Sequence, residues 1–173
     1  MPEWLRTSRA MPMTPTTAVA SDSDTHFRGT LPLAYREPLE HLFFFNPGQL
    51  QYQSAIRRTV ETYGMPVIYE SGDHLTLRLN GSTATETLFM LESRPTGELL
   101  RGAMMFSRVP MDTLMILHLA AAPIESSLAS ASATNWAGRL VQKALEIAHQ
   151  VRGISFVGLP YSGNRLRIEG AGR

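Results

Sequence analysis

The chain has 173 residues, a net charge of +1 and no cysteine, and 43% of its residues are hydrophobic. This length suffices for one domain with a hydrophobic core, and the near-zero charge argues against nucleic-acid or anionic-membrane partners. Without cysteine, disulfides and thiolate chemistry are excluded, which fits a cytoplasmic protein. No apolar run reaches the roughly 20 residues that span a bilayer, so we expect no membrane insertion.

The first part of the chain predicts a tail and two helices. Residues 1–27 are rich in Ser, Thr, Pro and Asp, which predicts a disordered N-terminal tail before a single domain over residues 28–173. The segment EPLEHLFFF (37–45) predicts a short helix that buries its aromatic side chains. Pro47-Gly48 then breaks the chain, and residues 50–64 follow the spacing of an amphipathic helix.

A run of strands follows. Leu75, Leu77 and Leu79 alternate with polar residues, as in a half-buried strand. The last segment of the run is almost continuously apolar, which predicts burial on both faces. Because the connections are short, we predict an antiparallel meander. Its strands are residues 74–81, 85–93, 99–109 and 113–122.

Residues 134–151 carry the clearest helical pattern in the chain, with apolar side chains on one face. Thr134 or Asn135 can cap its start. The segment ISFVGLP (154–160) is a further strand, and a strand–helix–strand crossover is normally parallel. A short last strand lies within 164–170. We therefore predict an α+β fold of three layers, with a mixed, mostly antiparallel sheet and a central helix crossover.

The order of these elements resembles that of the GNAT superfamily of N-acetyltransferases over residues 85–160. TLFMLESRPTGELLRGAMMFSRVPMDTLMILHLAAAP is similar to the family's second to fourth strands. AGRLVQKALEIAHQVRGISFVGL is similar to its central helix and fifth strand. The resemblance implies an acetyltransferase-like fold in which these last two strands separate. Acetyl-coenzyme A would lie between them, with its pantetheine on the fourth strand and its pyrophosphate at the helix start.

The resemblance also implies which residues hold acetyl-coenzyme A. Its pantetheine would pair with one strand and its pyrophosphate with free amides at the helix start. A cation in the first turn of that helix, as at Arg139, opposes the helix dipole unless an anion is present. The implied residues are Leu119, Ala120, Ala121, Thr134, Asn135, Gly138 and Arg139. The family's signature positions fall on Ala131, Thr134 and Trp136, where the usual residues are replaced.

For catalysis, His118 is the candidate general base, since imidazole titrates near neutrality. Tyr161 is the candidate acid that protonates the leaving thiolate, a role that the resemblance implies. Glu92 is a further possible base, which we expect to be a solvated surface carboxylate. The segment SGNRLR (162–167) could form a small anion-binding nest or a plain turn. The five histidines show no metal-ligand spacing, so we expect no metal site.

Three functional hypotheses follow. The first is transfer of an acetyl or acyl group from acyl-coenzyme A to an amine. The second is a non-catalytic module that uses the same sheet to bind a protein partner or a second copy. Its methionine-rich segment AMMFSRVPMDTLM suits varied partner surfaces. The third is a small dimeric domain like a secretion chaperone, with GMPVIYESGDHLTLRLNG as the start of its sheet.

Overall fold

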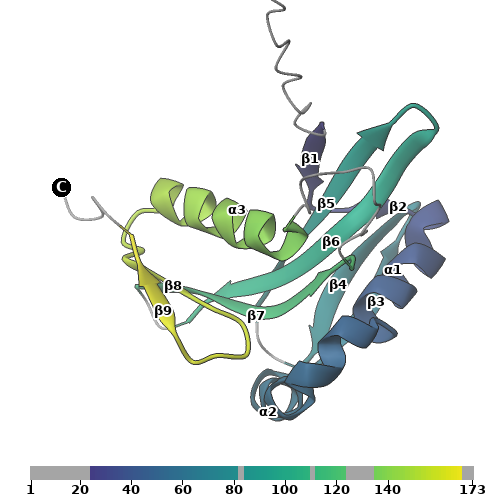
Figure 1. Ribbon diagram of the computed structural model, residues 1–173. Coiled ribbons are helices and arrows are strands. Elements are labelled where there is room, and N and C mark those ends of the chain that lie inside the picture. The colour runs from purple at the N-terminus through teal and green to yellow at the C-terminus, as the bar shows by residue number, and fades with distance from the viewer. Residues whose placement is uncertain (1–23, 82–83, 110–111, 124–134, 169–173) are drawn as a thin grey trace, which may run out of the picture.

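A six-stranded mixed sheet forms the centre of the protein (Figure 1). All neighbouring strands are antiparallel except β7 and β8, which are parallel. In sheet order, its strands are β1 (Thr25–Arg28), β5 (Glu86–Arg94), β6 (Gly97–Arg108), β7 (Thr113–Ala121), β8 (Phe156–Gly158) and β9 (Arg165–Arg167). The computed structural model describes residues 24–81, 84–109, 112–123 and 135–168.

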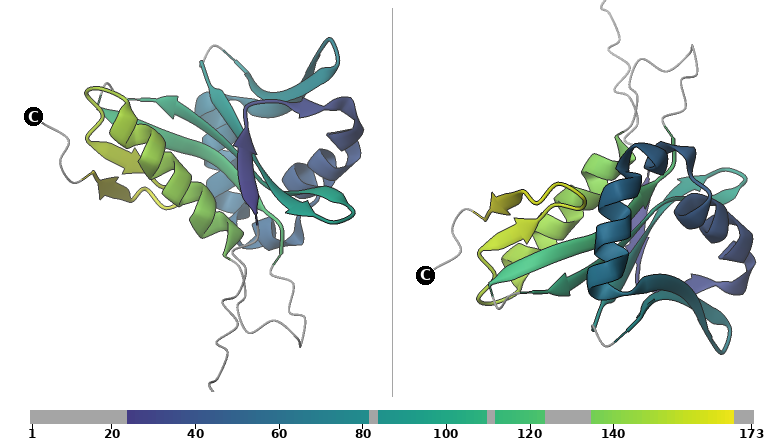
Figure 2. Two further views of the ribbon diagram at one scale, coloured as in Figure 1. Left: turned by 90° about the horizontal axis from the view of Figure 1, so that it is seen from above. Right: turned by 90° about the horizontal axis from the view of Figure 1, so that it is seen from below.

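A second, three-stranded antiparallel sheet and the helices pack around this centre. The small sheet has the order β2 (Leu31–Pro32), β4 (His74–Asn80) and β3 (Met65–Ser71). The helical segments are η1 (Leu33–Tyr35), α1 (Arg36–Phe44), η2 (Pro47–Tyr52), α2 (Gln53–Tyr63) and α3 (Trp136–Gln150). Figure 2 shows α3 on one face of the central sheet and α1 and α2 on the other. The protein therefore has three layers.

The alternation of side chains along β5 and β6 divides the core into two clusters. Phe89 and Leu91 of β5 pack with α1 and β4 on one face. Met90 of β5 and Met104 of β6 pack on the other face, against Leu140 of α3. All of these side chains are fully buried, so the central sheet is covered on both faces.

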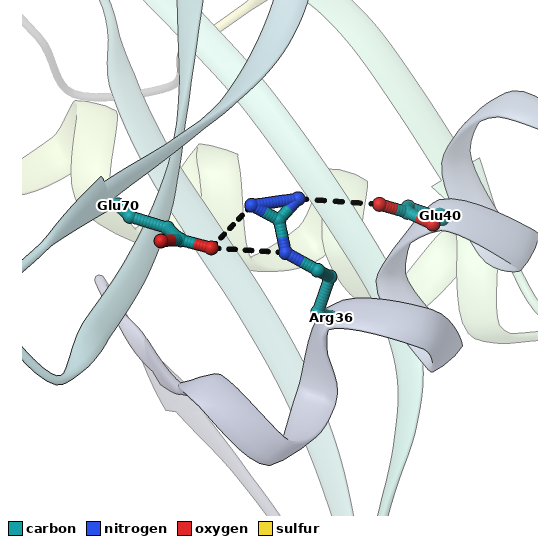
Figure 3. Close-up of polar contacts among 3 residues, drawn as sticks. All are labelled: Arg36, Glu40 and Glu70. Atoms are coloured by element: carbon teal, nitrogen blue, oxygen red, sulfur yellow. Dashed lines mark hydrogen bonds and ion pairs between the residues drawn. The ribbon is translucent and has the colours of Figure 1, made fainter.

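An ion-pair cluster on the surface joins α1 to the small sheet (Figure 3). The guanidinium of Arg36, the first residue of α1, donates to Glu70 of β3 through Nε at 3.0 Å and also through Nη2. Its Nη1 lies 3.3 Å from Glu40, one turn along α1. These side chains are exposed, so the cluster contributes little to stability.

The coarse fold prediction is confirmed: the protein is α+β, its sheet is mostly antiparallel, and α3 crosses over between parallel strands. The predicted meander is wrong at its first strand. Only β5, β6 and β7 form a meander, whereas β4 pairs with β3 in the small sheet. The reason is local, because β3 and β4 are joined by a tight turn at Gly72, and a short loop costs little closure entropy.

Two further predictions need correction. Residues 25–27 belong to β1 and not to a tail, because their backbone pairs with β5 in the register Thr25↔Glu92. Residues 1–23 lie outside the described residues. The predicted helix at 37–45 is confirmed as α1, but it buries only Phe43 among its aromatics. Phe45 is 69% exposed, because it follows the last turn of α1 and points away from the core.

Candidate functional site

Strands β7 and β8 pair only over a short stretch and then separate. The pairing runs from Thr113↔Phe156 to Met115↔Gly158, although β7 continues to Ala121. The backbone groups of β7 that face β8 beyond this point need other partners, because buried amides and carbonyls must be paired. We call this stretch, Leu119 to Ala121, the open edge of β7.

Side chains complete the open edge of β7. The Leu119 amide donates to the Tyr161 hydroxyl oxygen at 3.2 Å. The Leu119 carbonyl accepts from Nε2 of Gln49 at 3.3 Å, and the Ala121 carbonyl accepts from Nδ2 of Asn46 at 2.8 Å. The groups that would bind another strand are therefore held by three polar side chains. Side chains can turn away, so an extended ligand with its own amides could replace them.

A β-bulge in β7 places His118. In the pairing with β6, Met105 lies opposite His118 and Phe106 lies opposite Ile116, so Leu117 is the extra residue. Such a bulge breaks the alternation of side chains. Leu117 packs in the core cluster on the α1 face, and the His118 ring lies on the same face at 6.2 Å from the Phe43 ring. The bulge thus buries a polar side chain beside the open edge.

Tyr161 lies just after β8, in a backbone conformation that non-glycine residues rarely adopt. Its φ is 62°, in the left-handed region. Strained backbone of this kind concentrates at functional sites. The conformation aims the ring at β7, where its hydroxyl lies 3.5 Å from Nδ1 of His118. The ring also stacks on Tyr52, with centroids 5.7 Å apart.

Burial keeps both His118 and Tyr161 neutral. It lowers the pKa of His118 to about 4 and raises the pKa of Tyr161 to about 12, the latter opposed by the hydrogen bond from the Leu119 amide. The Leu119 amide donates to the Tyr161 hydroxyl, which can in turn donate to Nδ1 of a neutral His118. In that tautomer the His118 proton is on Nε2, which is buried and lacks a hydrogen-bond partner within the described part of the chain.

Two cavities meet at Tyr161. The α3-side cavity, of about 510 Å³, lies between the start of α3, the end of β7 and residues 46–52. The α2-side cavity, of about 440 Å³, lies between α2 and the part of β7 around the bulge. Three residues line both cavities: Leu159, Tyr161 and Ser162. The Tyr161 side chain is therefore reachable from two directions.

The structure brings together most of the residues predicted from sequence. Five of them line the α3-side cavity: Leu119, Ala121, Asn135, Gly138 and Tyr161. His118 is 2% exposed and lies behind Tyr161. Ala120 does not line either cavity, because its side chain is buried in the core cluster on the α1 face. Thr134 and Ala131 lie outside the described residues.

The start of α3 has a side-chain cap. Oδ1 of Asn135 accepts from the Gly138 amide at 2.9 Å. Asn135 is one of the two residues, with Thr134, that the sequence predicted as the cap. A Cβ atom at position 138 would lie 2.7 Å from Nδ2 of Asn135, so the Asn135 side chain would have to shift to make room for it. Trp136 is 6% exposed and packs in the α3 core cluster. The guanidinium of Arg139 lies 5.9 Å from the centroid of the Trp136 ring, and Arg139 does not line the α3-side cavity.

Sequence reasoning missed Asn46, Gln49 and Tyr52. They follow α1 in a segment that the sequence marks as a chain break, and only an asparagine before Pro47 hints at a side-chain cap there. The expectation for Glu92 was wrong. Its side chain is largely buried, and it pairs with Arg101 at 2.7 Å, which makes it part of the core instead of a solvated base.

No group of three or more His, Asp and Glu side chains that could hold a metal ion occurs among the described residues. Over the same ranges, every helix is too short or too polar to cross a membrane. In comparisons with protein-family models, curated proteins and solved structures, no match was found.

Proposed function

We propose that this protein transfers an acyl group from acyl-coenzyme A to a primary amine. The observation that carries the proposal is the meeting of the two cavities at Tyr161, where β7 and β8 separate. Direct transfer needs a donor and an acceptor whose reacting atoms come within about 3.5 Å in one place. The thioester would enter from the α3-side cavity and the amine from the α2-side cavity.

The fold that we propose is acetyltransferase-like, and the arrangement around the open edge supports this. The meander β5–β6–β7, the crossover through α3 and the separation of β7 from β8 are the features that the resemblance implies. The amides of a pantetheine arm would bond to the Leu119 amide and carbonyl in place of Tyr161 and Gln49. The pyrophosphate would lie at the start of α3, where free amides and the helix dipole favour an anion.

The residues around Tyr161 suit this reaction. The amine nitrogen attacks the thioester carbonyl, a C–N bond forms, the C–S bond breaks, and one proton passes from nitrogen to sulfur. Tyr161, whose pKa of about 12 keeps it protonated, can give its proton to the thiolate and take one from the nitrogen. His118, with a pKa of about 4, is too weak a base for this. We therefore assign it the positioning of the Tyr161 hydroxyl.

A second candidate function is a non-catalytic binding module. Asn46, Gln49 and Tyr161 already satisfy the open edge of β7, so the protein needs no ligand to complete it. Phe45 and Leu50, beside this segment, are 69% and 72% exposed and could contact a partner. This function predicts no affinity for coenzyme A.

The experiment that tests the proposal combines binding and turnover. Thermal unfolding with millimolar acetyl-coenzyme A should show a rise of several degrees in melting temperature, because the ligand binds only the folded protein. Released coenzyme A can be followed with a thiol reagent across a panel of primary amines. The chain contains no cysteine, so the reagent detects only the product. If acetyl-coenzyme A produced no thermal shift and no amine caused thiol release, the proposal would be overturned.

A matched pair of variants locates the binding site. Ala137→Glu adds a carboxylate to the first turn of α3, beside the α3-side cavity. A carboxylate there suits the helix dipole but repels a pyrophosphate, so the fold should persist while the thermal shift is lost. Gln142→Glu adds the same charge to α3 at a position that lines neither cavity, and it should keep the shift.

A further inference from the structure

We propose that the acceptor amine carries a carboxylate, and that Arg58 binds this carboxylate in the α2-side cavity. The inference rests on the proposed function and names the substrate class for it. Among the described residues that line the α2-side cavity, Arg58 is the one charged residue, and no described Asp or Glu lines either cavity. An acceptor with several positive charges, such as a polyamine, would find no counter-charge there.

Arg58 has no acidic partner among the described residues, unlike several other arginines of the protein. Arg28, Arg36 and Arg101 are each paired with a glutamate. Among the residues that the structure describes, no carboxylate lies within 4.0 Å of the Arg58 guanidinium. Its planar fork of donors matches a carboxylate in a bidentate geometry. A ligand carboxylate would supply the missing partner.

The rest of the α2-side cavity suits a small acceptor with an apolar body. The hydroxyl oxygen of Ser162 accepts from the Asn164 amide at 3.2 Å, so its proton is left to donate to a ligand. Met115, Leu117 and Tyr63 supply an apolar wall. The volume of about 440 Å³ fits a molecule the size of an amino acid. Its amine would lie at Tyr161 and its carboxylate at Arg58.

The test compares amines that share an apolar body and differ in the group beside the amine, with kcat/KM expressed per unprotonated amine because their basicities differ. Leucine, leucinamide and isoamylamine share one apolar body, and only leucine carries a carboxylate. With acetyl-coenzyme A as donor, kcat/KM for leucine should exceed that for the other two by about tenfold or more, as expected for a charge-assisted pair of hydrogen bonds. Arg58→Gln should remove this preference through KM, with kcat little changed. Arg58→Lys should keep part of it, because the charge remains without the fork.

Arg57→Gln is the matched control, since Arg57 neighbours Arg58 on α2 but lines neither cavity. It should leave the preference for leucine intact. Equal kcat/KM for leucine and leucinamide would overturn the inference while leaving acyl transfer in place. So would a preference for leucine that Arg58→Gln does not change.

A binding measurement keeps the two proposals apart. Calorimetric titration with N-acetylleucine and N-acetylleucinamide needs no turnover. Binding of the carboxylate form alone, lost in Arg58→Gln and kept in Arg57→Gln, would support the anion site even if no thiol were released. Selective binding of N-acetylleucine without any thiol release would overturn acyl transfer but not the role of Arg58. Equal binding of the two probes, or binding of neither, would overturn the role of Arg58.

Discussion

The Tyr161 hydroxyl oxygen lies 3.5 Å from Nδ1 of His118 and 3.2 Å from the Leu119 amide. The two residues are 43 positions apart, and two irregularities bring them together. One is the bulge at Leu117, which turns His118 toward the α1 face. The other is the left-handed backbone of Tyr161. Both irregularities therefore converge on one buried contact beside the open edge of β7.

The buried His118 predicts a stability that depends on pH. Its pKa is about 4 in the folded protein, against 6.5 when unfolded, so the unfolded chain binds more protons between these values. The stability from this residue is therefore complete above pH 6.5 and declines as the pH falls toward 4. From pH 7.5 to 5.0 we expect a loss of about 2 kcal/mol in the free energy of unfolding.

Urea unfolding at the two pH values measures this loss, and His118→Gln supplies the comparison. Glutamine keeps a polar side chain that does not titrate, so the variant should lose about 2 kcal/mol less than the parent over the same range. Parallel pH dependence in both proteins would show that His118 is not the group responsible.

Removing the Tyr161 hydroxyl should reduce turnover and leave binding intact. In Tyr161→Phe the ring can still stack on Tyr52, but no proton can be donated to the thiolate. We expect kcat to fall about 100-fold or more, as for loss of a general acid. The thermal shift with acetyl-coenzyme A should stay. Tyr69→Phe makes the same change in β3, outside both cavities, and should keep full activity. Full activity in Tyr161→Phe would remove this residue from the mechanism.

Regular patterns in the sequence predict the elements of this fold well. The apolar stripe of α3 and the alternation in β4 extend over enough residues to fix both their type and their buried face. Pairing between strands is harder to predict, because it depends on which strand is near in space. β4 has the expected pattern, yet it joins the small sheet. β1 was missed because its few residues show no period.

The candidate site could be predicted only in part, for a similar reason. His118 and Tyr161 stand out as titratable groups beside apolar strands. Asn46 and Gln49 do not, because their role is to bind carbonyl groups of β7. These carbonyl groups lie 75 residues from Asn46 and 70 residues from Gln49 along the chain. Residues that act through backbone contacts distant in sequence leave no local pattern. The bulge at Leu117 likewise has no sequence signal.

Replacing Gly64 with alanine should strongly reduce the stability of the protein. This residue ends α2 with φ of 104° and ψ of 163°, a region that only glycine adopts readily. A Cβ atom there would lie 2.8 Å from the Asn80 carbonyl oxygen, and both groups belong to the backbone. Gly64→Ala should therefore lower the free energy of unfolding by about 3 kcal/mol.

Gly72→Ala is the control for Gly64→Ala. Its φ is 62°, but an added Cβ atom would meet nothing within 4 Å. We expect a loss of about 1 kcal/mol from backbone strain alone. Equal losses for the two variants, measured by urea unfolding, would mean that the contact with Asn80 carries no cost.

For the ion pair Glu92–Arg101, a single substitution should destabilise the protein more than replacement of both residues. Nε of Arg101 lies 2.7 Å from Glu92, and their side chains are only 7% and 10% exposed. Glu92→Gln removes the carboxylate charge to which the buried guanidinium of Arg101 donates, which should cost about 3 kcal/mol in urea unfolding. Replacing both residues, with Glu92→Leu and Arg101→Met, removes the charge and its partner together. The double variant should then be less destabilised than Glu92→Gln, because no charge is left buried. A double variant at least as unstable as Glu92→Gln would show that the pair itself holds β5 and β6 in register.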